Sequence, residues 1–127
     1  MYYLNKSTEL SFDEAEQKIR ASLQEEGFGI LTEIDMQATM KNKLDKEIPK
    51  YKILGACNPG FAYEAIQVEQ KIGIMLPCNV TIIENKEGNI DVSIMDPVVG
   101  LSIVENEAVE PFAIQVKEKL KRALSNL

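Results

Sequence analysis

Two cysteines are the side chains of this sequence best suited to chemistry. Cys57 follows the apolar run 51–56 and directly precedes Asn58-Pro59, where a helix is expected to begin because proline suits the first helical position. The positive end of a helix dipole stabilises a thiolate, so this position predicts a lowered pKa for the Cys57 thiol. Cys78 lies in the next apolar segment. If these two strands run parallel through a crossover helix, both cysteines fall at the same end of the sheet.

A neighbouring pair of thiols permits thiol or persulfide chemistry, binding of a soft metal ion, or a redox disulfide. The spacing of the pair does not match Cys-x-x-Cys, and two thiolates do not complete a structural zinc site, which takes four ligands. The alternative is that both cysteines are packed in the core as small hydrophobic residues. We take Cys57, Asn58 and Cys78 as candidate ligand-binding residues and expect no metal site.

Three carboxylates stand at expected strand ends beside loops, where sites often form: Glu33, Asp35 and Asp96. A pair of carboxylates with separated pKa values can carry out acid–base catalysis. Asp35 and Asp96 also have a structural interpretation, since the first can cap a helix and the second can fix an Asp-Pro turn. We keep all three as candidate ligand-binding residues.

The chain contains no histidine. This absence excludes Ser-His-Asp and Cys-His nucleophile activation, a histidine general base and histidine-ligated zinc. Catalysis would have to use carboxylates, thiols, tyrosines or lysines, or a cofactor that the sequence does not identify. A binding module is therefore a better expectation than an enzyme.

The net charge is −6, from 20 acidic and 14 basic residues, and this balance argues against a nucleic-acid partner. The one basic cluster, residues 117–122, suits the negative end of a terminal helix dipole. The start of the sequence lacks the features of a signal peptide, and the longest uncharged stretch, 72–83, is too short to span a bilayer. We expect a cytoplasmic protein without a membrane partner.

Apolar periodicity predicts a single domain over residues 1–127. Strands are expected at 2–6, 28–34, 51–56, 74–83 (interrupted at 77–79), 90–94 and 98–104. Helices are expected at 11–27, 36–44, 59–71 and from about 107, the first of them opened by a Ser11/Glu14 capping box and closed by Gly27. This order favours a two-layer α+β fold, with a mainly antiparallel sheet and helices on one face, over a doubly wound α/β fold.

Four ordered blocks of the sequence, 27–35, 51–59, 72–80 and 95–97, resemble the bacterial and archaeal domain-of-unknown-function family numbered 302. The resemblance implies a fold of the TATA-box-binding-protein-like type, with a curved antiparallel sheet and a long C-terminal helix. It also implies a homodimer, which is consistent with the need to cover sheet edges. No reaction is assigned to the family, so the resemblance carries over no catalytic residue.

These observations favour a module that handles a small ligand, a thiol, sulfur or a metal at the end of the sheet where Cys57 and Cys78 lie. Two other functions remain open: a homo-oligomeric interaction or structural protein without chemistry, and a carboxylate-based enzyme that lacks histidine. A pocket that holds both thiols would favour the first function. A large apolar surface patch with separated, buried thiols would favour the second.

Overall fold

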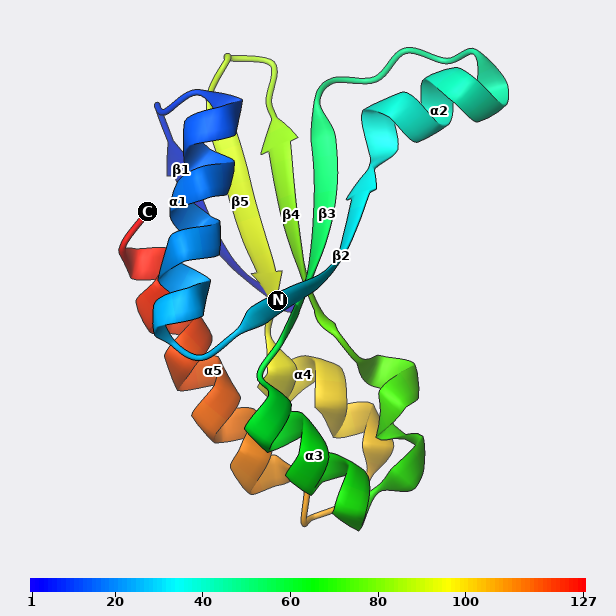
Figure 1. Ribbon diagram of the computed structural model, residues 1–127, viewed down its shortest axis with the longest axis vertical. Coiled ribbons are helices and arrows are strands. Elements are labelled where there is room, and N and C mark those ends of the chain that lie inside the picture. The colour runs from blue at the N-terminus through cyan, green and yellow to red at the C-terminus, as the bar shows by residue number, and fades with distance from the viewer.

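The computed structural model describes residues 1–127 and contains one five-stranded sheet with the strand order β1-β5-β4-β3-β2 (Figure 1). Every neighbouring pair of strands is antiparallel. The strands are β1 (Tyr3–Thr8), β2 (Gly29–Asp35), β3 (Tyr51–Cys57), β4 (Cys78–Glu84) and β5 (Ile90–Met95). The helices are α1 (Phe12–Glu25), α2 (Met36–Leu44), α3 (Pro59–Val68), α4 (Pro97–Gly100) and α5 (Glu110–Ser125), with 3-10 turns η1 (Gln70–Met75) and η2 (Leu101–Val104).

Helices α1 and α5 cover one face of the sheet and enclose the main core (Figure 1). Strand β5 shows why one face is covered: Ile90, Val92 and Ile94 are buried, while the residues between them are only half-buried. This alternation is typical of an antiparallel sheet with one packed and one open face. The predicted two-layer α+β fold is confirmed. The TATA-box-binding-protein-like label stays a prediction.

Local sequence signals set the ends of α1. The Ser11 hydroxyl accepts a hydrogen bond from the Glu14 N–H at 3.2 Å, and the Glu14 carboxylate accepts one from the Ser11 N–H at 3.1 Å. Gly27 follows the helix with a φ of 87°, a conformation that favours glycine. The predicted capping box and glycine stop are both confirmed.

A small lobe, defined as α3, η1, α4, η2 and the first half of α5, lies beyond one end of the sheet (Figure 1). It has a hydrophobic core of its own, separate from the main one and formed by Ala65, Ile72, Leu101, Val109 and Ala113. The molecule therefore has two cores, and α5 extends from one to the other.

The first part of the expected strand 74–83 and the whole of the expected strand 98–104 are wrong, and both segments lie in the small lobe, whereas residues 80–83 belong to β4 as predicted. Residues 74–76 belong to η1 and the turn after it, and residues 98–104 form α4 and η2. Short apolar runs in buried helical segments and in strands look alike in sequence, because periodicity cannot separate them at this length. The possibility that β3 and β4 run parallel is also wrong. The chain leaves the sheet at the end of β3, passes through the lobe and re-enters the sheet at the same end, so β4 runs antiparallel to β3.

Helix α2 projects from the opposite end of the sheet and forms an arm (Figure 1). None of its residues is buried. Its start is fixed by Asp35, whose side chain accepts a hydrogen bond from the Ala38 N–H at 2.9 Å. An isolated helix of this length is marginally stable in water, so the arm depends on its junction with β2 and β3.

Gly55 provides a test of the packing at the end of β3. A Cβ atom at this position would lie 2.6 Å from Cγ of Pro77 and would also meet the Thr32 hydroxyl. We expect Gly55→Ala to lower the free energy of unfolding by about 1–3 kcal/mol, because overpacking forces neighbouring atoms to move. Urea denaturation followed by circular dichroism measures the change.

The matched control is Gly29→Ala in the adjacent strand, where an added Cβ meets no atom within 4 Å. This substitution should leave the free energy of unfolding within about 0.5 kcal/mol of the parent value. Equal losses in the two variants would contradict the packing described for Gly55.

Candidate functional site

The two cysteines lie at the same end of the sheet, as the sequence predicts, but for a different reason. In the antiparallel pair β3/β4, Cys78 is opposite Ala56, the residue before Cys57. The Cα atoms of the two cysteines are thus about 6 Å apart, the diagonal spacing of neighbouring antiparallel residues. The end of β3 lies beside the start of β4 because the two strands are antiparallel and need no crossover connection. This arrangement places the two cysteines close together.

Both cysteines line an apolar cavity of about 40 Å³ between the sheet and the small lobe. Its wall combines residues of the main core, such as Phe28 and Val116, with residues of the lobe core, such as Ala65 and Leu101. Of the 16 residues in the wall, 13 are hydrophobic. Asn58 is the single polar side chain among the remaining three, so no charged group faces the cavity.

Burial controls the ionisation of both thiols. It raises the pKa of the half-buried Cys57 thiol, and it raises the pKa of the buried Cys78 thiol to about 11. The charge of a Cys57 thiolate would raise the pKa of Cys78 further. The expected lowering of the Cys57 pKa by the α3 N-terminus is therefore wrong, because the loss of hydration opposes the thiolate. Both thiols are neutral at pH 7.

Asn58 does not cap α3 with its side chain. Its amide nitrogen instead donates a hydrogen bond to the Glu26 carbonyl oxygen at 3.3 Å. Asn58 thus connects the start of the lobe to the end of α1 beside the cavity. This bond turns the amide nitrogen of Asn58 to the backbone of Glu26.

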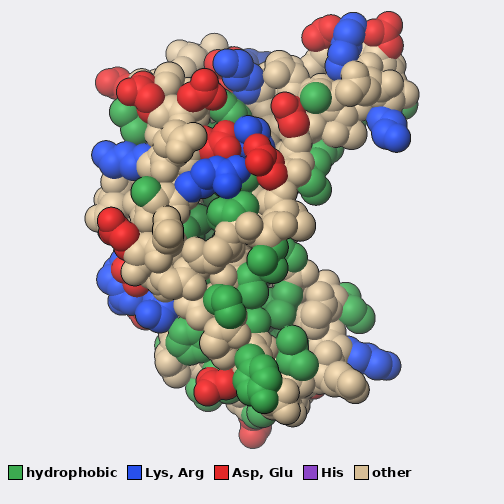
Figure 2. All heavy atoms as spheres, in the orientation of Figure 1, with side chains coloured by type: hydrophobic (Ala, Val, Ile, Leu, Met, Phe, Trp, Pro, Cys, Tyr) green, Lys and Arg blue, Asp and Glu red, His purple; other side chains and the backbone are tan.

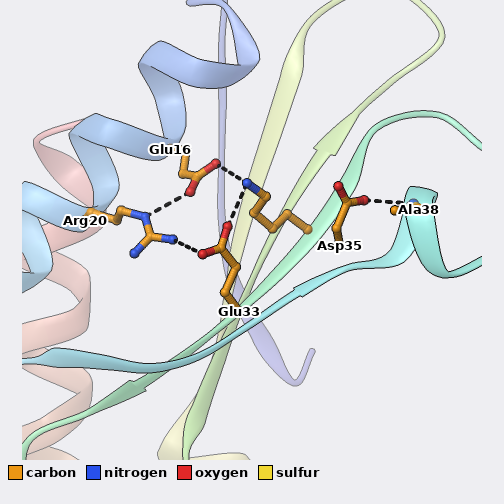
Figure 3. A network of polar contacts seen from close by, with 6 residues as sticks. Glu16, Arg20, Glu33, Asp35 and Ala38 are labelled. Carbon is orange, nitrogen blue, oxygen red and sulfur yellow. Dashed lines mark hydrogen bonds and ion pairs between the residues drawn. The ribbon is translucent and has the colours of Figure 1, made fainter.

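Glu33 belongs to a closed ring of four ion pairs (Figure 3). The guanidinium of Arg20 lies 2.9 Å from the Glu16 carboxylate and 3.1 Å from that of Glu33. The Lys52 ammonium completes the ring, at 2.8 Å from Glu16 and 2.9 Å from Glu33. Hydrogen bonding to Lys52 lowers the pKa of Glu33, and Arg20 adds to the effect. Both oxygens of Glu33 are occupied, which leaves no free carboxylate here for acid–base catalysis.

Asp35 and Asp96 make the contacts of helix caps. Asp35 caps α2 through Ala38, as Figure 3 shows. Asp96 is buried at the start of α4, where one oxygen accepts the Val98 N–H at 2.9 Å and the other lies 2.9 Å from the Lys117 ammonium. Burial raises the pKa of Asp96, but these hydrogen bonds outweigh it and hold the pKa below its usual value.

The candidate carboxylates do not come together. Asp35 ends β2 at the arm end of the sheet, whereas Asp96 follows β5 at the lobe end. A catalytic pair of carboxylates is therefore absent among them. Of the candidate residues, Cys57, Asn58 and Cys78 share one wall, and Asp96 lies next to it, because Pro97 lines the same cavity.

Sequence reasoning missed the partners of these groups. Glu16 and Arg20 are four residues apart on α1, a spacing that indicates an ion pair on one helix face. Lys52 stands in an apolar strand, and a lysine in that setting signals a need for a carboxylate partner. The lobe side of the cavity left no such signal, because it depends on how α3 and α5 pack.

Two kinds of feature are absent from the molecule. No group of three or more cysteine, aspartate or glutamate side chains is arranged to hold a metal ion. None of the helices has the length and apolar character needed to cross a lipid bilayer.

The fold and the site define a class of two-layer α+β domains in which a small helical lobe closes an apolar cavity at one end of an antiparallel sheet. The family model described as "Domain of unknown function DUF302" matches residues 4–127, and the chain belongs to this family. A comparison with curated proteins gave no match.

A solved structure supports the fold. It is described as "Crystal structure of uncharacterized conserved protein DUF302 from Bacillus stearothermophilus". The two chains superimpose with a TM-score of 0.92 at 21% sequence identity, over 99% of this chain and 98% of the other. At this identity the similarity establishes the shared architecture, and the function has to be argued from the site.

The burial of the two thiols makes a prediction about their reactivity. The two thiols can be measured separately, Cys57 in the Cys78→Ser variant and Cys78 in the Cys57→Ser variant. Iodoacetamide should alkylate Cys57 faster than Cys78, because Cys57 is half-buried and Cys78 is buried. The rate at Cys78 should rise about tenfold per pH unit through pH 9 to 10, since its pKa is about 11 and the thiolate is the reactive form.

Mass spectrometry of the intact protein gives both rates, and urea-unfolded samples of the same variants give the reference rates. Equal rates in folded and unfolded protein would contradict the buried placement. Rates that level off below pH 8 would show that the pKa values are lowered after all.

Proposed function

We propose that the protein binds a small, uncharged, apolar molecule in the cavity between the sheet and the small lobe. The observation that carries this proposal is the chemistry of the wall, in which Asn58 is the one polar side chain and no charge is present. Water gains few hydrogen bonds from such a wall, whereas an apolar molecule gains contacts with the apolar side chains that line it. The two thiols are neutral, weakly polar parts of the wall.

The position of the cavity also favours a binding function. It lies where two separate cores meet. Every buried side-chain polar atom in the molecule already has a hydrogen-bond partner, so a ligand does not have to supply one. A volume of about 40 Å³ admits a few heavy atoms, and a larger molecule requires the lobe to move away from the sheet. The raised pKa values of both thiols support binding over nucleophilic catalysis.

The small lobe is suited to such movement. It contacts the main core through α5, through Phe61 of α3, which packs against that core, and through the chain segments that leave and enter the sheet. Several of its apolar side chains remain exposed, including Ile74 at 81% and Tyr63 at 67%, and Figure 2 shows hydrophobic side chains gathered on the surface of the lobe. A lobe whose core has only five buried residues can shift when a ligand adds new contacts, because few buried contacts hold it in place.

Benzene and xenon are suitable probes, because both enter dry apolar cavities. We expect saturating benzene to raise the midpoint of thermal unfolding, since a ligand that binds only the folded state stabilises it. Ala65→Leu should remove the effect, because Ala65 is buried in α3 and lines the cavity. The xenon-129 chemical shift should change with wild-type protein and not with this variant.

The matched control is Ala21→Leu, which adds the same atoms to an exposed position of α1. It should respond to benzene as the wild type does. If the Ala65→Leu protein, shown to be folded by circular dichroism, responds equally to both probes, the cavity is not their binding site and the proposal fails.

We further propose that the protein acts as a homodimer in the cytoplasm. The exposed edge strand β2, with Leu31 at 66% and Ile34 at 44% exposure, and the arm without a buried residue support an association. Both cysteines are unpaired, which suits a reducing compartment.

Multi-angle light scattering at micromolar concentration should give twice the chain mass of 14.2 kDa. The apparent mass should fall on dilution if the association is reversible. A monomer mass at all concentrations up to 100 μM would rule out the homodimer.

A further inference from the structure

The sheet face that α1 and α5 do not cover crosses all five strands and has no helix packed on it. We propose that this uncovered face stacks on the same face of a second copy and that each α2 arm lies along the partner chain. The inference rests on the proposed homodimer and assigns its surface.

The middle of the face is a row of residues that crosses all five strands. Strand register places Asn5, Ser93, Thr81, Ile53 and Ile34 side by side, from β1 to β2. None of the five side chains is charged, although 27% of the residues in the chain are. A sheet face that evolved to meet water is expected to carry lysine and glutamate at such positions.

The rows on either side have the same character. The row toward the lobe includes Tyr3, Met95 and Asn79, and the row toward the arm includes Asp91, Ile83 and Tyr51. Asp91 is the one carboxylate of the face, and no lysine or arginine occurs on it. Tyrosine and methionine are enriched, and charged groups depleted, at the centre of interfaces between proteins.

The single charge of the face is already held within the chain. One oxygen of Asp91 accepts a hydrogen bond from the Asn5 amide at 2.7 Å, and the other accepts one from the Ser93 hydroxyl at 3.1 Å. A second copy therefore does not have to supply a cation for it. A neutral face is self-complementary in a two-fold interface, where each patch meets its own copy.

The area of the face shows why the arm belongs to the interface. Five strands about 4.8 Å apart and about 20 Å long give roughly 480 Å² in projection. A stable interface buries about 800 Å² of accessible surface per partner, so the flat sheet supplies only part of it. The arm begins at Met36, two residues after Ile34 of the uncovered face, and presents Leu44 at 61% exposure.

The shape of the molecule fits this arrangement. A hollow of about 580 Å³ lies over the face, lined by Tyr3, Tyr51 and Thr81 among others. The outline is concave between the arm and the small lobe (Figure 2). Two packed sheets lie about 10 Å apart, which leaves room for the tyrosines of each copy to fill the hollow of the other.

The exposed apolar side chains of the small lobe are the competing surface. They include Tyr63, Ile66, Ile74 and Ile103, and they are spread over α3, η1 and η2. Three short helical segments do not form a continuous plane, whereas the sheet face does. The uncovered face is therefore the better surface for a second copy.

The test places one charge at the centre of the face. Thr81 lies on the middle row and on the middle strand of the sheet, so Thr81→Lys would set two ammonium groups against each other near the two-fold axis. We expect the dissociation constant of the dimer, measured by analytical ultracentrifugation, to rise at least 100-fold. Deletion of the arm, by joining residues 35 and 50 through a short glycine–serine turn, should also weaken the dimer.

Two control variants separate the possible outcomes. Gln17→Lys makes the same charge change on the exposed side of α1 and should leave the dimer intact. Ile66→Lys probes the lobe and should also leave it intact. If the dimer survives Thr81→Lys, or is lost with Ile66→Lys alone, the assigned surface is wrong but the proposed homodimer stands. If the wild-type protein is monomeric, both the assigned surface and the proposed homodimer are wrong.

Discussion

The burial of a single apolar face of α5 is the interaction on which the rest of the molecule depends. Its first half packs in the lobe core through Ala113, together with Val109, the residue directly before the helix, and its second half packs in the main core through Val116 and Leu120. It is the one helix with buried residues in both cores, although Phe61 of α3 also packs against the main core from the lobe. The cavity lies where the two halves meet, so the geometry that joins the cores also creates the space between them.

Electrostatics connects the same parts of the chain. Lys117 of α5 pairs with Asp96, which caps α4 and lies beside the cavity wall, and Arg122 pairs with Glu26 at the end of α1 at 2.9 Å. Exposed pairs of this kind add little to stability, but a buried carboxylate such as Asp96 fixes where its partner helix can lie. The charges therefore specify the position of α5, and hydrophobic burial provides most of the free energy.

The sequence predicted the sheet and the long helices because their signals are local. The alternation in 90–94, the Ser11/Glu14 box and Gly27 each act within a few residues, and all three are confirmed. The helices of the lobe at 59–71 and from about 107 are predicted, but its segments 74–76 and 98–104 are predicted as strand because they are apolar without a readable period. What makes them helical is burial against Val109 and Ala113, which are distant in sequence.

The site was predictable only in part. The sequence places Cys57, Asn58 and Cys78 at one end of the sheet on the assumption of parallel strands, whereas it is the antiparallel register of β3 and β4 that brings them there. The sequence predicts the wrong direction for the Cys57 pKa shift. The local signal, a helix N-terminus, favours the thiolate, but the lobe buries the thiol from water, and this burial cannot be inferred from nearby residues. Asp35 and Asp96 follow local capping patterns, and their contacts agree with the structural interpretation.

The strand order has a consequence for how the chain acquires its structure. The first strand, β1, pairs only with the last one, β5, and its register joins Tyr3 to Met95. On the ribosome, residue 3 thus has no strand partner until residue 95 has emerged, and the β4–β5 hairpin has to form beforehand or at the same time. Closing so long a loop is entropically costly and slows folding relative to chains with local contacts. During synthesis β1 therefore cannot join the sheet before β5 has emerged, and shorter nascent chains present β1 as a segment without its native strand partner.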